Sequence, residues 1–563
     1  MKNFFKILFI SLGVVFCILI IAIIAIFSAV RSGIDNPVYK LKNGQVLEIS
    51  IAGEIPELPP EEMEKLISKN SYCFYELLSS IRRAAEYDEI KGIYLNFTGA
   101  SPGWAQTEEL VKELNYFKSR GKEIWAYFDY MDDCGYSLAS AADRIYCSKN
   151  AILLLDGLSA NIMFYKDTLK KIGIEFEAVR HGKYKSAVEP FTLSDISREN
   201  REMLTVYLNS ISKNYTGLIS RNRKIKNIEN IINKGPFLIT KELKDRKLVD
   251  DICIEEEVFL RSGFSREDLV SISDFLKVPE KIPFDQKNRI ALIIAEGEIL
   301  GGRTAGKGII NDRALIKDLK TAFDDVRVKA LVLRINSPGG SGSASDNIWQ
   351  FIESQKKKKP LIVSMGDFAA SGGYYIGMSG KKIFADRNTT TGSIGVFFIR
   401  PLLEGLYEKI GLNVVRIKTA PNAGFFTQKN RFTEQQREKV QNFIDDFYSD
   451  FVNKAAKGRG KKYEEIEALA GGRIWSGSQA KENGLIDFIG GIIDALEAAK
   501  KAGDMENKNP AIDIYPESRP LIEQLFDRNL YLKGDISKLA RYAGGLKEKG
   551  EAKLIMPYTL ELD

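Results

Sequence analysis

The sequence predicts an α/β protein built from two tandem copies of one parallel-sheet unit, with a single transmembrane helix ahead of them. Three observations indicate this. Two long stretches repeat each other in register, each copy alternates short apolar runs with helical patterns, and residues 7–30 are almost entirely apolar. Of 563 residues, 44% are hydrophobic and 28% are charged, an ordinary globular composition that excludes a disordered or collagen-like chain.

The apolar run of residues 7–30 is long enough to cross a bilayer core of roughly 30 Å. A cleavable signal peptide has a shorter apolar region, so we expect a retained anchor rather than a removed leader or a buried helix. Lys2 and Lys6 precede the run and Arg31 alone follows it, which favours a cytoplasmic N-terminus at residues 1–6. We therefore expect a single-pass protein, held in the lipid bilayer, with its body on the exported side.

An internal repeat follows the anchor. VLEISIAGEI (46–55) recurs as IALIIAEGEI (290–299), and IKGIYLNF (90–97) matches VKALVLRI (328–335). From there the halves align without a gap, so that residue n of the first copy matches residue n + 238 of the second. A constant register over so long a stretch indicates a tandem duplication.

Each copy alternates short strands with helices, which predicts parallel pairing. In the second copy a strand ends near residue 370, and a helix is expected at 371–378. A further strand is expected at NVVRI (413–417), and a long amphipathic helix beginning near 432.

These patterns divide the chain after its anchor into three parts. We expect the first repeat at 46–285, the second at 286–503, and a more polar tail at 504–563 that has no counterpart in the first copy.

Residue counts exclude several classes of function. The chain has 81 basic and 75 acidic residues, so its net charge of +6 does not support a nucleic-acid-binding surface. Five cysteines without a CxxC pair argue against a disulfide framework or a zinc site. His181 is the single histidine, which excludes multi-histidine metal sites. We expect neither a metal nor a cofactor.

Two glycine-rich junctions of the second copy could support chemistry. A strand runs into SPGGSGS (337–343), where adjacent glycines let backbone N–H groups face a ligand, as in an oxyanion hole, although such a sequence is also a common turn. The next strand ends at Ser371, among small residues at a strand-to-helix junction. Ser371 is therefore a candidate nucleophile, and an ordinary helix N-cap is the alternative.

The repeat suggests where the base for Ser371 lies. Asp133 of the first copy matches Ser371, and Ala423 of the second copy matches Lys185, so each copy lacks what the other retains. This complementarity predicts one composite site, with Ser371 from the second copy and Lys185 from the first. A buried lysine can lose its charge near neutral pH. His181 as the base is an alternative at this point.

Four motifs now identify a resemblance to serine peptidase family S49, the membrane-anchored Ser/Lys signal peptide peptidases, in their long duplicated form. They are SPGGS (337–341), MGDFAASGGYY (365–375), TGSIGV (391–396) and YKSAVEPF (184–191).

The resemblance implies a fold, a set of site residues, a cellular location and an oligomeric state. The fold would be the ββα superhelix of caseinolytic protease and crotonase. Ser371 would be the nucleophile and Lys185 the general base, Gly340 and Gly372 would supply oxyanion N–H groups, and Ser393 would orient the lysine. The family degrades cleaved signal peptides at the bacterial inner membrane, and its long members form bowl-shaped tetramers.

Two other functions remain open from the sequence. A crotonase-like enzyme acting on acyl-thioesters would share the paired glycines but would have no use for Ser371 and Lys185. A catalytically silent membrane scaffold of the same fold would leave Ser371 unreactive.

Overall fold

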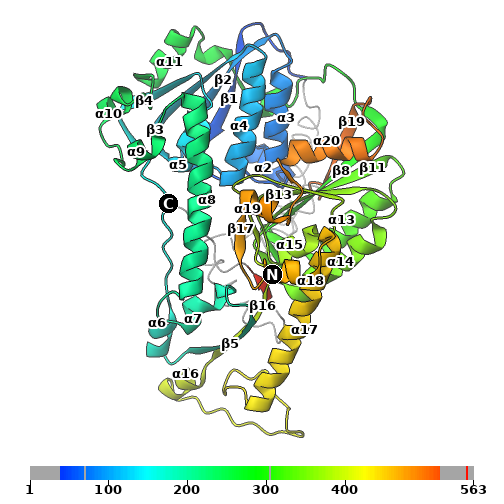
Figure 1. The fold of residues 1–563 in the computed structure, drawn as a ribbon. Helices are drawn as coiled ribbons and strands as arrows, with labels where there is room; N and C mark the ends of the chain where they lie inside the picture. The colour runs from blue at the N-terminus through cyan, green and yellow to red at the C-terminus, as the bar shows by residue number, and fades with distance from the viewer. Residues whose placement is uncertain (1–37, 69–70, 303–305, 520–552, 556–563) are drawn as a thin grey trace, which may run out of the picture.

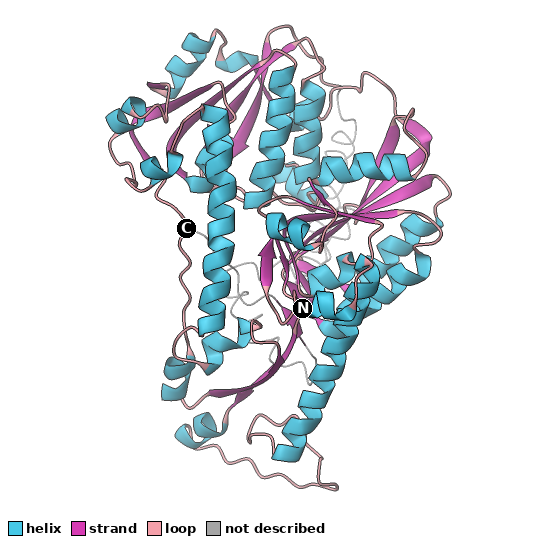
Figure 2. Ribbon diagram, viewed as in Figure 1, coloured by secondary structure: helices cyan, strands magenta, loops and turns pink. Residues whose placement is uncertain are grey.

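The computed structural model describes residues 38–68, 71–302, 306–519 and 553–555. Two α/β units lie side by side, and an arm containing the long helices α8 and α17 extends from them (Figures 1 and 2). The predicted membrane segment, residues 7–30, lies outside the described residues. Within the described ranges, no helix combines the length and the apolar character needed to cross a membrane.

The first copy contains the following helices, strands and 3₁₀ turns: β1 (Gln45–Ile51), α2 (Glu62–Ile67), α3 (Phe74–Ala84), β2 (Ile90–Phe97), α4 (Trp104–Ser119), β3 (Glu123–Asp132), α5 (Asp133–Ala139), β4 (Arg144–Leu154), α6 (Lys166–Lys171), β5 (Glu175–His181), η1 (Ser186–Val188), α7 (Glu189–Thr192), α8 (Arg198–Arg223), α9 (Ile228–Ile232), α10 (Thr240–Asp245), β6 (Asp251–Ile252), α11 (Glu255–Ser262), η2 (Arg266–Asp268), β7 (Leu269–Ser271) and α12 (Ile272–Phe275).

The second copy and the tail contain these elements: β8 (Asp285–Glu296), β9 (Glu298–Leu300), β10 (Ile309–Asn311), α13 (Asp312–Asp324), β11 (Val328–Ser337), β12 (Gly339–Ser341), α14 (Gly342–Gln355), β13 (Leu361–Ala370), α15 (Gly372–Gly377), β14 (Lys382–Ala385), β15 (Thr390–Gly392), β16 (Val396–Leu402), α16 (Glu404–Lys409), α17 (Glu434–Arg459), α18 (Tyr463–Glu467), β17 (Ile474–Ser476), α19 (Gly477–Asn483), β18 (Phe488–Ile489), α20 (Ile492–Ala502), β19 (Pro510–Tyr515) and β20 (Lys553–Ile555).

Each copy contributes one mainly parallel sheet. The first sheet has the order β6-β4-β3-β2-β1-β7, and the second has the order β17-β15-β13-β11-β8-β19, with β14 and β18 branching from β13. The central strands β2 and β11, β3 and β13, and β4 and β14 begin 238 residues apart, as the repeat predicts. The strands are apolar nearly throughout because helices cover both faces of a parallel sheet. The α/β duplication read from the sequence is therefore confirmed.

A third sheet combines both copies and the tail, in the order β10-β9-β12-β20-β16-β5. Here β5 of the first copy pairs antiparallel with β16 of the second, from His181 opposite Val396 to Glu175 opposite Leu402. Because β5 leads directly toward Lys185, this pairing brings Lys185 of the first copy to Ser371 of the second.

The copies also share a core and a buried ionic cluster. Apolar residues on one face of the second sheet, such as Leu292 and Val332, belong to the same buried cluster as the core of the first copy. Beside it, Arg334 is fully buried, and its Nη2 lies 2.7 Å from both Glu57 Oε1 and Glu109 Oε1.

Two boundaries differ from the sequence prediction. Residues 510–515 form β19 at the edge of the second sheet, where β7 lies in the first, so the second unit continues past residue 503. Residues 413–417, expected as a strand, form neither helix nor strand. Their apolar residues are typical of a strand, but no described strand lies beside them to pair with.

Candidate active site

The candidate nucleophile, Ser371, lies between the end of β13 and the start of α15. Its backbone has φ 56° and ψ −113°, a conformation that non-glycine residues rarely adopt and that is typical of functional sites. The Ser371 N–H donates to the Gly392 carbonyl at 2.8 Å, which ties the turn to β15. The Ser371 side chain does not cap the helix, so the N-cap alternative does not describe it.

Lys185 of the first copy reaches this serine. Its Nζ lies 2.7 Å from Ser371 Oγ, 2.9 Å from Ser393 Oγ and 3.0 Å from the Ser393 carbonyl oxygen. Lys185 is completely buried, and burial holds the pKa of its amine well below the usual range. Three oxygens around one nitrogen fit a neutral amine that donates twice and presents its lone pair once.

Close backbone packing holds the Lys185 turn in place. The Arg180 side chain donates to the Lys185 carbonyl at 2.9 Å and forms an ion pair with Glu189 at 3.2 Å. On the other side, Gly472 has φ +87°, and a Cβ built on it would lie 2.5 Å from Lys185 N. Only glycine allows the two chains to approach so closely.

The paired glycines lie beside the nucleophile. Gly339 and Gly340 lie in β12 with φ values of 107° and 157°, and a Cβ on Gly340 would lie 2.0 Å from the Ile299 carbonyl oxygen. A Cβ on Gly372 would lie 3.2 Å from Gly340 N. The backbones of Gly340 and Gly372 are thus adjacent at the side of Ser371.

His181, the alternative base, makes its side-chain contacts with α17. Its Nδ1 lies 2.6 Å from Asp445 Oδ1, and its ring stacks on Tyr448 with centroids 3.8 Å apart. This contact joins β5 to α17. The structure therefore pairs Ser371 with Lys185 and not with the single histidine.

The equivalent position in the first copy carries no nucleophile. Asp133 lies there, buried, accepting a hydrogen bond from Tyr215 Oη at 2.8 Å and contacts at 3.3 Å from Asp156 N and Gly157 N. Burial raises the pKa of Asp133 to about 6. The position in the second copy therefore holds a serine in contact with an amine, whereas the position in the first copy holds a carboxyl group in contact with a tyrosine hydroxyl.

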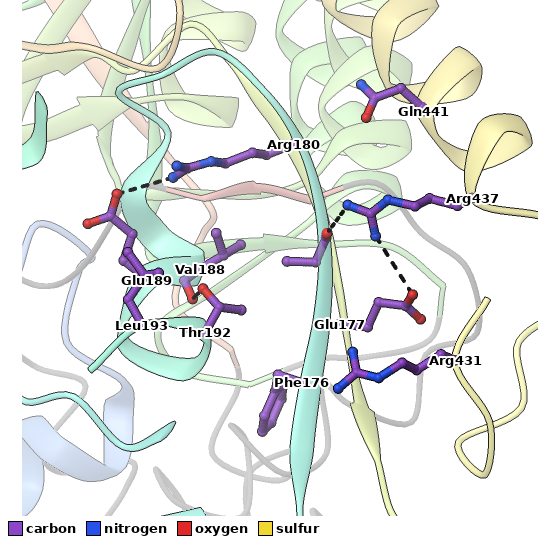
Figure 3. Close-up of a pocket in the computed structure, with 11 residues that line it drawn as sticks. Phe176, Glu177, Arg180, Val188, Glu189, Thr192, Leu193, Arg431, Arg437 and Gln441 are labelled. Atoms are coloured by element: carbon purple, nitrogen blue, oxygen red, sulfur yellow. Dashed lines mark hydrogen bonds and ion pairs between the residues drawn. The ribbon is translucent and has the colours of Figure 1, made fainter. Parts of the chain in front are cut away.

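A cavity of about 370 Å³ lies between β5 and α17, close to the Lys185 turn (Figure 3). Arg180, Arg431 and Arg437 line it together with Glu177 and Glu189. Arg180 forms an ion pair with Glu189, and Arg437 forms one with Glu177. It shares Arg180 with the site but contains neither Ser371 nor Lys185. Across the ranges that the structure describes, no cluster of three or more His, Cys, Asp or Glu side chains is arranged to hold a metal ion.

Sequence reasoning missed three supports of this site: Arg180, Gly472 and the strand β20. The Gly-Gly pair at 471–472 is a weak sequence indication of a close backbone contact, but Lys185, which Gly472 approaches, is distant in the sequence. Nothing in the sequence indicates that Arg180 would hold the Lys185 carbonyl.

Comparisons with known proteins agree with these features. The profile of "Peptidase family S49" matches residues 116–263 and 353–506, once in each copy. "Serine protease SPPA, chloroplastic" of Arabidopsis thaliana is 32% identical over 500 residues, 86% of this chain and 73% of that protein. "Protease 4" of Haemophilus influenzae is 32% identical over 471 residues, 79% of this chain and 75% of that protein.

Among solved structures, a ClpP1 mutant from Listeria monocytogenes matches 36% of this chain and 94% of its own, with a TM-score of 0.23 and 19% identity. The two matches to the family and the length of the alignments with these proteases decide the classification. This chain belongs to peptidase family S49, in its long duplicated form, and is a serine protease.

Proposed function

We propose that this protein is a membrane-anchored endopeptidase that uses a Ser371/Lys185 dyad to degrade apolar peptides, including cleaved signal peptides. The observation that carries the proposal is the 2.7 Å contact between Lys185 Nζ and Ser371 Oγ inside a fully buried site. The membrane setting rests on the apolar run of residues 7–30 and on the resemblance to the family.

The reaction is an acyl transfer. Neutral Lys185 takes the hydroxyl proton as Ser371 Oγ attacks the scissile carbonyl carbon. The N–H groups of Gly340 and Gly372 hold the oxyanion, and each such donor is usually worth about 3–4 kcal/mol. The protonated lysine then gives its proton to the leaving amine, and a water molecule repeats the sequence to release the acyl group. Ser393, through both of its oxygens, orients the Lys185 amine.

The substrate is expected to bind as an added β-strand. Support comes from β20, in which Leu554 lies opposite Gly340 in antiparallel pairing with β12. Lys553 also lies opposite Phe397 of β16, so an extended segment fits between these two strands. Peptides of this kind, released at a membrane surface, suit a site tethered beside it.

Three further features belong to the same proposal. We infer a single-pass protein of the bacterial inner membrane, with residues 1–6 in the cytoplasm and the catalytic body outside. The detailed fold is the ββα superhelix of caseinolytic protease and crotonase, and the chains assemble as tetramers. All three rest on the resemblance to the family.

A fluorophosphonate probe tests the dyad directly. We expect rapid labelling of the wild-type chain, none with Ser371→Ala, and a loss of at least about 100-fold with Lys185→Ala, a typical contribution of a general base. His181→Ala should retain most of the labelling. Labelling that survives Lys185→Ala but fails in His181→Ala would overturn the dyad.

The same experiment separates the rival functions. A silent scaffold predicts a wild-type Ser371 that does not react with the probe. A crotonase-like enzyme predicts turnover of acyl-thioesters that persists in Ser371→Ala, with no cleavage of peptides.

A further inference from the structure

A second cavity, of about 490 Å³, lies in the first copy, where residues at the C-terminal ends of α4, α8 and α10 come together. Neither Ser371 nor Lys185 lines it. Its lining is rich in cations, and the basic residues are Lys118, Arg223, Lys224, Lys244 and Lys247. A hollow lined mainly by charges of one sign concentrates ions of the opposite sign, so this cavity favours an anion.

The five basic side chains differ in whether an acidic residue neutralises them. Lys224 and Lys247 are exposed, and among the described residues neither ammonium group has an ion-pair or hydrogen-bond partner. Their two charges are therefore available to a ligand. The other three form ion pairs: Arg223 with Asp250 at 3.0 Å, Lys118 with Asp143 at 3.0 Å, and Lys244 with Asp251 at 2.6 Å.

Both free lysines have a backbone conformation that favours glycine. Lys224, the C-cap of α8, has φ 55°, and Lys247, just after α10, has φ 61°. The second copy has Gly460 (φ 62°) after α17 and Gly484 (φ 81°) after α19 at the corresponding positions. Glycine is the usual residue at such helix ends. The local backbone therefore does not explain why the first copy has a lysine at each of them.

The framework around these positions is common to both copies. In the second copy, Arg459 donates to Asp487 at 3.2 Å and to the Gly484 carbonyl at 3.2 Å. In the first copy, Arg223 donates to the Lys247 carbonyl at 3.1 Å in addition to its ion pair. The arginine contacts thus support the fold of each copy, whereas the two free ammonium groups occur at these positions only in the first.

We propose that this cavity binds a phosphate group, which Lys224 and Lys247 hold by charge-assisted hydrogen bonds. A phosphate group presents several strong acceptor oxygens, and the compact lysine ammonium is a common partner for it. The volume also accommodates a small organic group attached to the phosphate. A lipid headgroup and a dissolved phosphate ester both present this chemistry, and they differ in whether acyl chains are attached.

This binding site goes beyond the proposed protease function and does not depend on it. No residue that lines the cavity belongs to the dyad or to the glycines proposed for the oxyanion. Probe labelling of Ser371 should therefore stay within about twofold of wild type when the two lysines are replaced. Failure of the protease proposal and failure of the phosphate site are thus measured separately.

Isothermal titration calorimetry of the full chain in a neutral detergent tests the site, with glycerol 3-phosphate and dihexanoyl phosphatidate as ligands. We expect saturable binding of one phosphate ligand per chain. The double variant Lys224→Gly/Lys247→Gly, which copies the second copy, should lose at least about tenfold in affinity. Its urea unfolding midpoint should not fall, because glycine suits both backbone conformations.

The matched control removes the same charge nearby. Lys226 and Lys234 are exposed, lie in turns and do not line the cavity. Lys226→Gly/Lys234→Gly should therefore bind phosphate with the wild-type affinity. An equal loss of affinity in the control and in the cavity variant would show a general effect of net charge and would overturn the site.

The two ligands distinguish the sources of the phosphate. Phosphatidate binding at least about tenfold tighter than glycerol 3-phosphate would assign the site to a lipid headgroup, and equal affinities would assign it to a dissolved phosphate ester; either result supports a phosphate site. The proposal is wrong if neither ligand binds. It is also wrong if the cavity variant unfolds more easily but retains its phosphate affinity, because the lysines would then act only on the helix ends.

Discussion

In the proposed mechanism, burial of the Lys185 amine determines the pH range in which Ser371 can react. Because burial lowers its pKa, the amine is neutral above that pKa and protonated below it. Only the neutral amine accepts the Ser371 proton. We therefore expect the rate of probe labelling to rise with pH through the lowered pKa and to level off above it.

Labelling rates measured from about pH 4 to pH 9 would show this rise, since buried lysines can titrate as low as about pH 5–6. Lys185→Arg is the control, because a guanidinium stays protonated throughout and should give no labelling at any pH. A rate that is flat down to about pH 4 would exclude Lys185 as the base.

Gly472 shows how a residue without a side chain can hold a candidate catalytic residue in place. A Cβ at this position would lie 2.5 Å from Lys185 N, so Gly472→Ala should displace the Lys185 turn and slow labelling by at least about tenfold. Gly471→Ala is a matched control, because Gly471 also has a positive φ (66°) but its Cβ would approach Gly182 only to 3.8 Å. Equal rates in the two variants would argue against the close contact.

At the scale of single residues, the sequence indicated Ser371 and Lys185 because the duplication exposes what each copy lacks. It could not indicate Arg180 or Gly472, which act through backbone contacts made only after folding. The burial that lowers the pKa of Lys185 likewise depends on elements from both copies.

At the scale of elements, the tail strand β20 lies where a peptide substrate is expected. Its pairing with β12 must be given up before a substrate can pair there. A chain ending at residue 552 lacks the strand, and we expect it to be labelled several-fold faster than the full chain. A chain ending at residue 555 keeps the strand and should behave as the full chain does.

The probe-labelling rates of these two truncated chains, compared at equal concentration, measure the effect of the strand alone. Equal labelling of both would show that β20 does not restrict access to Ser371.

Most central elements could be predicted because buried parallel strands are strongly apolar and repeat at a fixed offset. The long helix α17 was expected to begin near 432 and begins at Glu434, after the N-cap Thr433. Short strands such as β12, β19 and β20 could not be predicted. Their pairing depends on partners far away in the sequence rather than on local pattern.

At the scale of the whole molecule, the Arg334 cluster joins the two copies. Arg334 comes from β11, whereas Glu57 and Glu109 come from the first copy, and all three side chains are buried. Removing the arginine leaves two buried carboxyl groups without their counter-charge. We expect Arg334→Met to lower the free energy of unfolding by about 3–5 kcal/mol.

Urea denaturation of the Ser371→Ala background, which avoids self-cleavage, measures this cost. Arg327→Met, which removes an exposed ion pair with Asp325, should leave the unfolding midpoint unchanged. Adding Glu57→Gln and Glu109→Gln to Arg334→Met should recover part of the loss, and no recovery would argue against a charge effect.

The sequence also predicted that the two copies pack against each other, because each copy lacks a residue of the candidate site that the other copy retains. It could not predict how the copies are held together. The sequence indication for Arg334 is a charged residue directly after the apolar run 330–333 of β11, and this does not identify its partners.

The pairing of β5 with β16 also determines when the candidate reaction centre can form while the chain is being synthesised. Lys185 follows β5 in the first copy, whereas Ser371 and the partner strand β16 come from the second copy. A nascent chain that has not reached residue 402 contains Lys185 but not the complete strand that places it. We therefore expect an emerging chain to stay unreactive until its second copy has been made.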